Sequence, residues 1–513
     1  MISLKKYITR IQQSTIIKGT LILTAAGFAT RIIGFLFRIF LTDKIGAEGL
    51  GIYQLIFPIQ IICYSICTIG FETSISKMTA ATIHHDSIPS KRYLKYGIVM
   101  SFLLSVVMST LLFQCSDWIC EHVLLEVRCN ILIKALAFSI PLTSIHACIC
   151  GYYIGCKNTN ITAVSQIVEQ LARVISIVVI IDYMEKSGAT PTPLCAVIGS
   201  VSGELIATFL CAFHIIRHIR LSKKKLSKNA VTYGIDFIKK RRLILSEIIT
   251  LALPISLNRL MLSVLQSIQS ILIPNMLILY GYSSQKALSV YGILLGLVIP
   301  FILFPGAFIN SLSLLLLPTI SQADSADNEA GIKKTTEKTL HFCCVFGIFC
   351  AAVFIHYGRD IGLTMLSDKE AGTYMCLLGI ICPFIYVTST LASIINGLGK
   401  TTVTFLFGVM ATILQIISIV TLMPIYGVYG YLLGFIGSNM LNALCLYLYI
   451  RRQIHISLRL FHSIVYPALT AFVIMKGITF LLSLVFTKMT LPVMAVSMNL
   501  VTVLYIWLLK EDF

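Results

Sequence analysis

Apolar segments of about 20 residues recur along the whole 513-residue chain. An α-helix rises 1.5 Å per residue, so a segment of this length can cross the roughly 30 Å hydrocarbon core of a bilayer. Only 12% of the residues are charged, against about 25% in soluble domains. These observations exclude a soluble enzyme and predict an all-α polytopic membrane protein.

Charges, glycines and prolines bound fourteen apolar segments, and we predict that each is a transmembrane helix. The first follows "MISLKKYITRIQQSTIIK" without a small-residue cleavage site, so we expect it to remain as an anchor. The predicted spans are 18–41, 50–80, 92–114, 130–155, 160–183, 193–217, 246–279, 287–317, 338–357, 373–395, 402–422, 427–450, 463–486 and 489–509.

Lysine and arginine predict the orientation of these helices. With the N-terminus in the cytoplasm, 26 basic residues fall on the cytoplasmic side and 7 on the other, as the positive-inside rule requires. Both termini are therefore predicted to be cytoplasmic. Because the rule accounts for much of the net charge of +18, we expect no nucleic-acid partner.

Two similar loops indicate an internal repeat. "GCKNTNIT" (155–162) and "GLGKTTVT" (397–404) join corresponding helices, and their lysines, Lys157 and Lys400, are 243 positions apart. We predict an N-terminal lobe (1–217, helices 1–6), a basic cytoplasmic linker (218–245), a C-terminal lobe (246–450, helices 7–12) and two appended helices (451–513). Since six is even, the two lobes share one orientation, and a cleft between them is the natural transport site.

Three arginines inside predicted spans are the candidate substrate-binding residues. A charge near the bilayer centre costs from about 2.5 to more than 10 kcal/mol unless it faces water or a partner. Arg31 and Arg38 are seven residues apart, so their side chains are only about 20° apart around the helix axis and lie on the same face. Arg259 occupies a similar place in helix 7. Guanidinium binds phosphate oxygens bidentately, so the three predict a phosphate-binding cavity. Carboxylates on other helices, or snorkelling toward the helix ends, are the alternative.

The acidic residues within the spans have two readings. Glu169 and Arg173 are spaced i, i+4, as in an intrahelical ion pair. Glu72 and Glu204 have no such neighbour, so they either complete ion pairs between helices or bind a coupling cation, Na⁺ or H⁺. The membrane potential is an alternative driving force, and we expect no other cofactor.

Two further features concern mechanism. Pro300 and Pro305 in "GLVIPFILFPGAF" interrupt one predicted span twice within six residues, which predicts a hinge. The sequence contains no Walker loop, HExxH motif or nucleophile elbow, and no metal-ligand spacing stands out. We therefore expect a transporter without a metal site rather than an enzyme.

The segment "KGTLILTAAGFATRIIGFLFRIFLTDKIGAEGLGIYQL", together with "SQIVEQLARV", "SGEL" and "INGLGKT", resembles the polysaccharide exporters and lipid II flippases of the MOP superfamily. That superfamily also contains the MATE multidrug transporters. Lipid II flippases carry S/T-R-x-x-G-F-x-R-D in the first helix, with the arginines in the cavity. Thr30, Arg31, Gly34 and Phe35 match this signature, whereas its final Arg-Asp pair is Phe37-Arg38 here.

The resemblance implies a MATE/MOP-like flippase in the bacterial inner membrane. Its substrate would be an undecaprenyl-pyrophosphate-linked saccharide, lipid II-like or a polysaccharide unit, moved to the outer leaflet by alternating access for spore cortex peptidoglycan synthesis. Cell-wall synthases are the expected protein partners. The alternatives are a MATE-like cation-coupled multidrug antiporter, which should expose carboxylates rather than arginines, and a non-transporting scaffold for the synthases.

Overall fold

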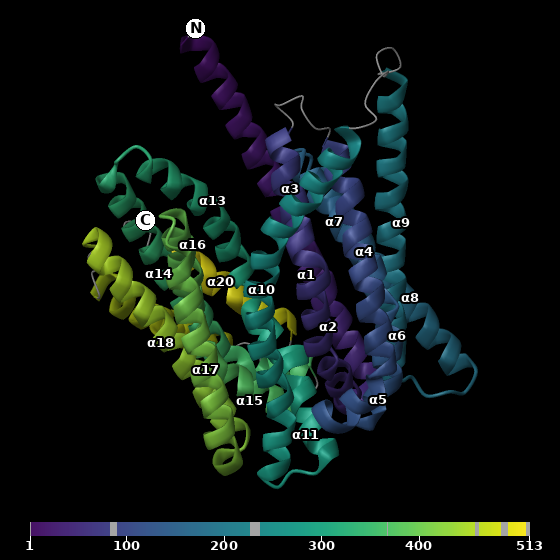
Figure 1. Cartoon of the computed structure of the whole chain (residues 1–513). Coiled ribbons are helices and arrows are strands. Elements are labelled where there is room, and N and C mark those ends of the chain that lie inside the picture. Colours follow the sequence, from purple (N-terminus) through teal and green to yellow (C-terminus); the bar gives the residue numbers. More distant parts are fainter. Residues whose placement is uncertain are drawn as a thin grey trace. The chain divides into compact units, whose positions relative to one another are not determined.

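A computed structural model describes residues 2–82, 90–225, 236–366, 368–456, 461–483 and 491–508, and within these ranges helices joined by short turns are the regular secondary structure, with no strand. The chain divides into two compact units, Met1–Ile271 and Leu272–Phe513. The first unit contains α1(Ile2–Leu55), α2(Phe57–Tyr64), η1(Ser65–Ile69), α3(Gly70–Thr82), α4(Ser90–Gln114), α5(Ser116–Trp118), η2(Ile119–Leu124), η3(Val127–Cys129), α6(Asn130–Ala137), α7(Ser139–Gly155), α8(Asn160–Lys186), α9(Pro193–Lys225) and most of α10(Asp236–Leu279) (Figure 1).

The second unit begins near the end of α10. It contains α11(Ser284–Tyr291), η4(Gly292–Val298), α12(Ile299–Leu303), α13(Gly306–Asp324), α14(Glu329–Met365), α15(Lys369–Leu378), η5(Gly379–Ile381), α16(Cys382–Gly397), α17(Thr401–Tyr426), α18(Val428–Ile454), η6(Phe461–Val465), α19(Tyr466–Ser483) and α20(Leu491–Leu508).

By length and composition, twelve described helices can cross a membrane, or thirteen if the bent pair Val127–Ala137 and Ser139–Gly155 forms one span. This confirms a multi-pass helical membrane protein, but it does not confirm the predicted number of fourteen. The first two predicted spans form one helical stretch, Ile22–Thr82, of 61 residues. A straight helix of that length would measure about 90 Å. Instead α1 bends at Gly46 (φ 76°), and in Figure 1 it runs down the view while α3 lies back at the upper end.

Another difference has a local cause. The predicted span 287–317 is divided into Ser284–Leu303 and Gly306–Asp324, because the helix is interrupted at Phe304 and Pro305. A proline cannot donate a backbone hydrogen bond, so a break at this point is expected. The last predicted span, 489–509, corresponds to α20, and the apolar part of α20 that meets the composition test is Val496–Tyr505.

Glycine pairs allow close helix packing in the first unit. Gly151 and Gly155 of α7 lie against α3. A Cβ added to Gly151 would be 2.4 Å from the Glu72 carbonyl oxygen, and one added to Gly155 would be 2.5 Å from the Ser76 carbonyl oxygen. On α9, Gly203 lies against α8, and an added Cβ would be 2.7 Å from the Glu169 carbonyl oxygen. Small residues four apart let membrane helices approach through their backbones. The side chains next to these glycines are thereby brought into one region.

The boundary between the units lies inside α10 and not in the predicted linker 218–245, of which residues 226–235 lie outside the described part. Ile244, Ile248 and Ala252 of α10 belong to a buried apolar cluster of the first unit. Further along, the Ser263 hydroxyl is 2.7 Å from that of Ser65, and Ser267 donates to the Pro58 carbonyl. The predicted division into lobes of six helices stays a prediction, because the contacts assign most of α10 to the first unit.

The two similar loops have the same backbone geometry. Three successive amides, at 156–158 in the first loop and at 398–400 in the second, donate to carbonyls four, three and five residues earlier. In each loop the middle residue is left-handed, Lys157 (φ 57°) and Gly399 (φ 75°). The structural offset is therefore 242, one less than the lysine spacing predicts.

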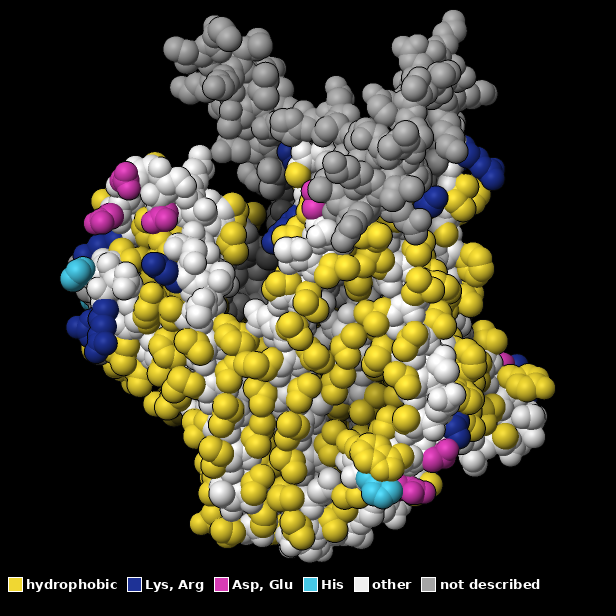
Figure 2. Space-filling view, in the orientation of Figure 1, with side chains coloured by type: hydrophobic (Ala, Val, Ile, Leu, Met, Phe, Trp, Pro, Cys, Tyr) yellow, Lys and Arg dark blue, Asp and Glu magenta, His cyan; other side chains and the backbone are white. Residues whose placement is uncertain are grey.

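Figure 2 shows a surface dominated by hydrophobic side chains along the helices, with charged groups mainly near their ends. Phe213, Phe472 and Val503 are among the large apolar residues that are exposed. Such extensive apolar exposure is typical of helices that face lipid.

Candidate functional site

The first-helix arginines differ in their surroundings. Arg31 is exposed and Arg38 is partly buried. The electrostatic neighbours of Arg38 include Tyr53 and Arg173 of α8. An added Cβ on Gly34, between the two arginines in sequence, would lie 3.2 Å from the Gln170 amide of α8. The Arg38 end of this face therefore packs toward α8, next to another guanidinium.

Arg259 of α10 is also exposed. Among the residues that the structure describes, neither Arg31 nor Arg259 forms an ion pair or hydrogen bond with a protein group. Neither guanidinium is therefore neutralised by a carboxylate in the described part of the chain. Their convergence on one cavity stays a prediction.

Glu169 and Arg173 form an ion pair along α8, and the Arg173 guanidinium also donates to the Gln170 side chain over 3.4 Å. The close approach of Gly203 to the Glu169 carbonyl puts the next residue of α9, Glu204, beside this pair. Glu204 is only 8% exposed. A buried carboxylate needs a hydrogen-bonding or cationic partner.

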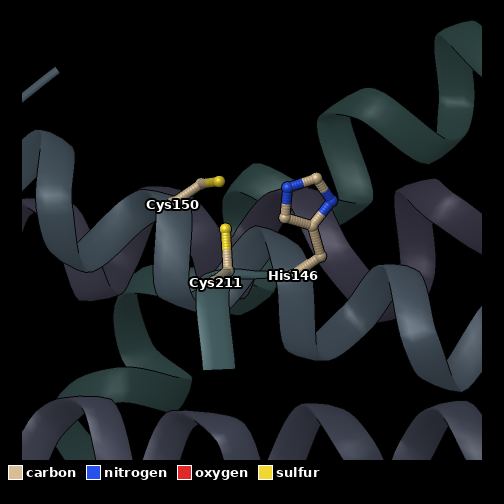
Figure 3. A group of neighbouring side chains, drawn as sticks. All are labelled: His146, Cys150 and Cys211. Carbon is tan, nitrogen blue, oxygen red and sulfur yellow. The ribbon is translucent and has the colours of Figure 1, made fainter. Parts of the chain in front are cut away.

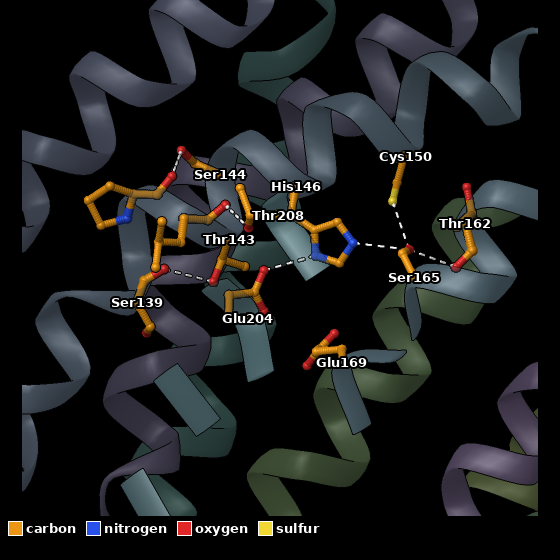
Figure 4. A network of polar contacts seen from close by, with 12 residues as sticks. Ser139, Thr143, Ser144, His146, Cys150, Thr162, Ser165, Glu169, Glu204 and Thr208 are labelled. Atoms are coloured by element: carbon orange, nitrogen blue, oxygen red, sulfur yellow. Dashed lines mark hydrogen bonds and ion pairs between the residues drawn. The ribbon is translucent and has the colours of Figure 1, made fainter. Parts of the chain in front are cut away.

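That partner is His146, which the sequence prediction did not include. Its Nδ1 lies 2.9 Å from Glu204 Oε1, and its Nε2 lies 3.1 Å from Ser165 Oγ (Figure 4). That prediction rested on Lys, Arg, Asp and Glu within spans and left out histidine. A histidine inside the apolar run "PLTSIHACICGYYIG" is the signal that could have found it.

Glu72 completes the group from α3. Its electrostatic neighbour is His146, and Glu169 likewise interacts with Glu204 and His146. The structure thus brings the three predicted acidic residues and Arg173 into one region centred on His146. Within this group Glu169 is paired with Arg173 and Glu204 with His146, so Glu72 is the carboxyl group without an ion pair in the described part of the chain.

Pro300 and Pro305 lie in the second unit, at the start of α12 and immediately before α13. Beside them is an apolar cavity of about 490 Å³, whose lining includes Phe304, Pro305 and Phe346. Packing next to the interruption is therefore incomplete. Hinge motion at these prolines stays a prediction.

A family model described as "Polysaccharide biosynthesis protein" matches residues 16–324, which is more than half of the chain. The chain belongs to this family. The match includes α1, the acidic region and the proline pair. Arg31, Arg38 and Arg259 all lie within the matched residues.

Similar proteins extend the comparison over nearly the whole chain. Stage V sporulation protein B of Bacillus subtilis is 23% identical over 438 residues, covering 84% of this chain and 83% of that protein. The lipid II flippase MurJ, solved in an inward closed conformation, superposes with a TM-score of 0.67 at 16% identity, covering 96% of this chain and 99% of that one. An inward-facing MATE multidrug resistance transporter gives a TM-score of 0.63 at 13% identity, covering 83% and 94%. The fold is therefore that of the MOP superfamily.

Proposed function

We propose that this protein is a flippase that moves an undecaprenyl-pyrophosphate-linked saccharide to the outer leaflet of the bacterial inner membrane by alternating access. One observation carries the proposal: Arg31 and Arg259, both on apolar helices, are exposed and have no protein carboxylate partner among the described residues. A guanidinium in that setting needs water and an anion. The pyrophosphate of a lipid-linked precursor supplies the anion, while its polyprenyl chain stays in lipid.

The similar proteins support the same substrate class. MurJ is named for lipid II, and the Bacillus subtilis relative is named for sporulation. We therefore assign the precursor to spore cortex peptidoglycan synthesis, with cell-wall synthases as partners and both termini in the cytoplasm.

Energy coupling is assigned to the acidic region. Glu72, Glu169 and Glu204 lie near His146, so carboxyl groups that can bind or release a cation are gathered in one region. Release of H⁺ or Na⁺ would leave this region negative and favour a different arrangement of α7, α8 and α9. The membrane potential is the alternative driving force.

The test is flipping of fluorescent lipid II by full-length protein in vesicles, read as exposure of the label to an impermeant quencher. Hydrogen bonds to charged groups contribute about 1.5–3 kcal/mol, so Arg31→Ala and Arg259→Ala should each slow flipping by roughly 10- to 100-fold. Arg31→Lys should retain part of the activity. Arg452→Ala, at an exposed arginine near the end of α18, is the control and should flip normally.

Wild-type rates in both arginine variants would refute the phosphate-binding role.

A second function, MATE-like antiport, is favoured by one observation, the structural similarity to that transporter. It predicts ethidium uptake that depends on a Na⁺ or H⁺ gradient and is lost in Glu204→Gln. Uptake of ethidium without lipid flipping would replace the flippase assignment.

A further inference from the structure

Three side chains with metal-binding atoms meet in the first unit, and the proposed transport cycle does not use two of them. His146 and Cys150 are one turn apart on α7, and Cys211 comes from α9. One nitrogen of His146 and the two sulfurs all lie within 4.8 Å of one another. All three residues are buried, and both cysteines are free thiols. Figure 3 shows the two sulfurs and one ring nitrogen directed toward a common space.

The hydrogen bonds of His146 leave the correct nitrogen available. Nδ1 is bonded to Glu204 at 2.9 Å, so Nε2 is the nitrogen that faces the cysteines. A histidine that binds a metal ion through one nitrogen usually donates the other N–H to a carboxylate, which fixes the ring and its tautomer. Glu204 has that role here.

The Ser165 hydroxyl oxygen is a fourth polar atom next to the three. It lies 3.1 Å from His146 Nε2 and 3.7 Å from Cys150 Sγ. The Thr162 carbonyl lies 2.9 Å from the same hydroxyl and can accept its hydrogen, which turns the lone pairs of the oxygen toward the imidazole. Nitrogen, sulfur and hydroxyl oxygen then point their lone pairs at the same space, and a positive charge there satisfies all of them.

We propose that His146 Nε2, Cys150 Sγ and Cys211 Sγ bind a soft transition-metal ion, with Zn²⁺ as the simplest choice. Zinc bonds of about 2.3 Å to sulfur and 2.0–2.1 Å to nitrogen place tetrahedral ligand atoms about 3.5–3.8 Å apart. The contacts of Ser165 are close to these values, and the trio needs to contract by no more than about 1 Å. Two thiolates neutralise a divalent ion, which suits a buried site.

A hard cation is a poorer fit to the same place. The group His146, Glu169 and Glu204 also has ligand atoms within 4.8 Å, but Glu169 is paired with Arg173 and Glu204 with His146. The Cys150 sulfur, by contrast, is not held by a carboxylate or guanidinium ion pair among the described residues, and it lies 3.7 Å from the neutral Ser165 hydroxyl. The proposal goes beyond transport, because the ion would join α7 to α9 inside one unit.

The experiment uses full-length protein purified in detergent without added chelator. Elemental analysis should find about one zinc ion per chain, and replacement with Co²⁺ should give a sulfur-to-cobalt charge-transfer band in the near ultraviolet. Cys150→Ser and Cys211→Ser should lose the band. Cys148→Ser is the matched control, since Cys148 is a buried cysteine of the same helix outside the trio, and it should keep the band. Glu204→Gln should weaken metal affinity by roughly 10- to 100-fold.

A second measurement needs no variant. Metal should protect Cys150 and Cys211 of the wild-type protein from alkylation, read by mass spectrometry, and should leave Cys115, which is exposed, reactive. The proposal is overturned if folded protein binds no stoichiometric metal. It is equally overturned by an unchanged band in Cys150→Ser, or by a disulfide between Cys150 and Cys211 in the purified protein. Normal lipid flipping with a disproved metal site would leave the proposed function intact.

Discussion

Single residues decide where charge can lie in the first unit. Glu204 is buried, and it is tolerated there because His146 is 2.9 Å away. Arg31 and Arg259 have no such protein partner among the described residues. The first unit thus holds two kinds of charge, one paired within the protein and one without a protein partner in the described part of the chain.

Lys157 provides a test of backbone conformation at this scale. It adopts φ 57° at the position where the second loop has Gly399, and a left-handed conformation costs a non-glycine residue roughly 1–2 kcal/mol. We expect Lys157→Gly to raise the free energy of unfolding by about 1 kcal/mol, and Gly399→Ala to lower it by a similar amount. Thermal unfolding in detergent measures both. A lower melting temperature for Lys157→Gly would contradict the assigned conformation.

Among the elements, the segment between α4 and α6 is secured to α1 by charge. Arg128 donates to Glu126 at 2.7 and 3.0 Å and to Glu48 of α1 at 2.6 Å. These bonds from Arg128 hold the pKa of the Glu126 carboxyl below its ordinary value of 4.5.

This lowered pKa predicts the pH dependence of stability. Because the folded state favours the ionised carboxylate, its contribution is complete above about pH 4.5 and is lost as the pH falls through the lower, folded-state pKa. Wild-type protein should therefore melt at a higher temperature than Glu126→Gln near neutral pH, and the difference should disappear in acid. A difference that persists or grows in acid would show that the effect does not come from ionisation.

The interruption between α12 and α13 is the second test at this scale. Replacing Pro305 by Ala restores a backbone donor, so we expect a more continuous helix, equal or higher thermal stability and slower lipid flipping. Pro318→Ala, at the proline inside α13, is the control and should flip at a nearly normal rate. Normal flipping by Pro305→Ala would remove the hinge role.

At the scale of the whole molecule, contacts assign most of α10 to the first unit. If this helix moves with that unit, Ser65→Cys and Ser263→Cys should form a disulfide in one double variant, since the two hydroxyl oxygens are 2.7 Å apart. Cross-linking, measured by mass spectrometry, should be equal with and without lipid substrate. The pair Ser65→Cys and Ser270→Cys, with Ser270 bonded only along its own helix, should not cross-link. A cross-link between Ser65 and Ser263 that depends on substrate would show that this part of α10 moves relative to the first unit. The division between the moving parts would then lie before α10, as in the predicted lobes.

The sequence predicted the helical class and the repeated loops because apolar length and turn residues are local signals. It did not predict that 287–317 is divided, because this depends on a single interruption at Phe304–Pro305. The i, i+4 spacing of Glu169 and Arg173 was visible in the sequence. The pairing of Glu204 with His146 was not, because it depends on how closely Gly203 lets α9 approach α8.

The backbone repeat is not a repeat of charge. At the structural offset of 242, the positions of His146, Glu169 and Arg173 correspond to Thr388, Ala411 and Gln415, none of which carries charge. A transmembrane voltage exerts about 2.3 kcal/mol per elementary charge for each 100 mV crossed. At these three positions a transmembrane voltage therefore acts on charged groups in the first half of the repeat alone. Because the opposite charges of the Glu169–Arg173 pair feel opposite forces, a net force there would come from a charge on His146.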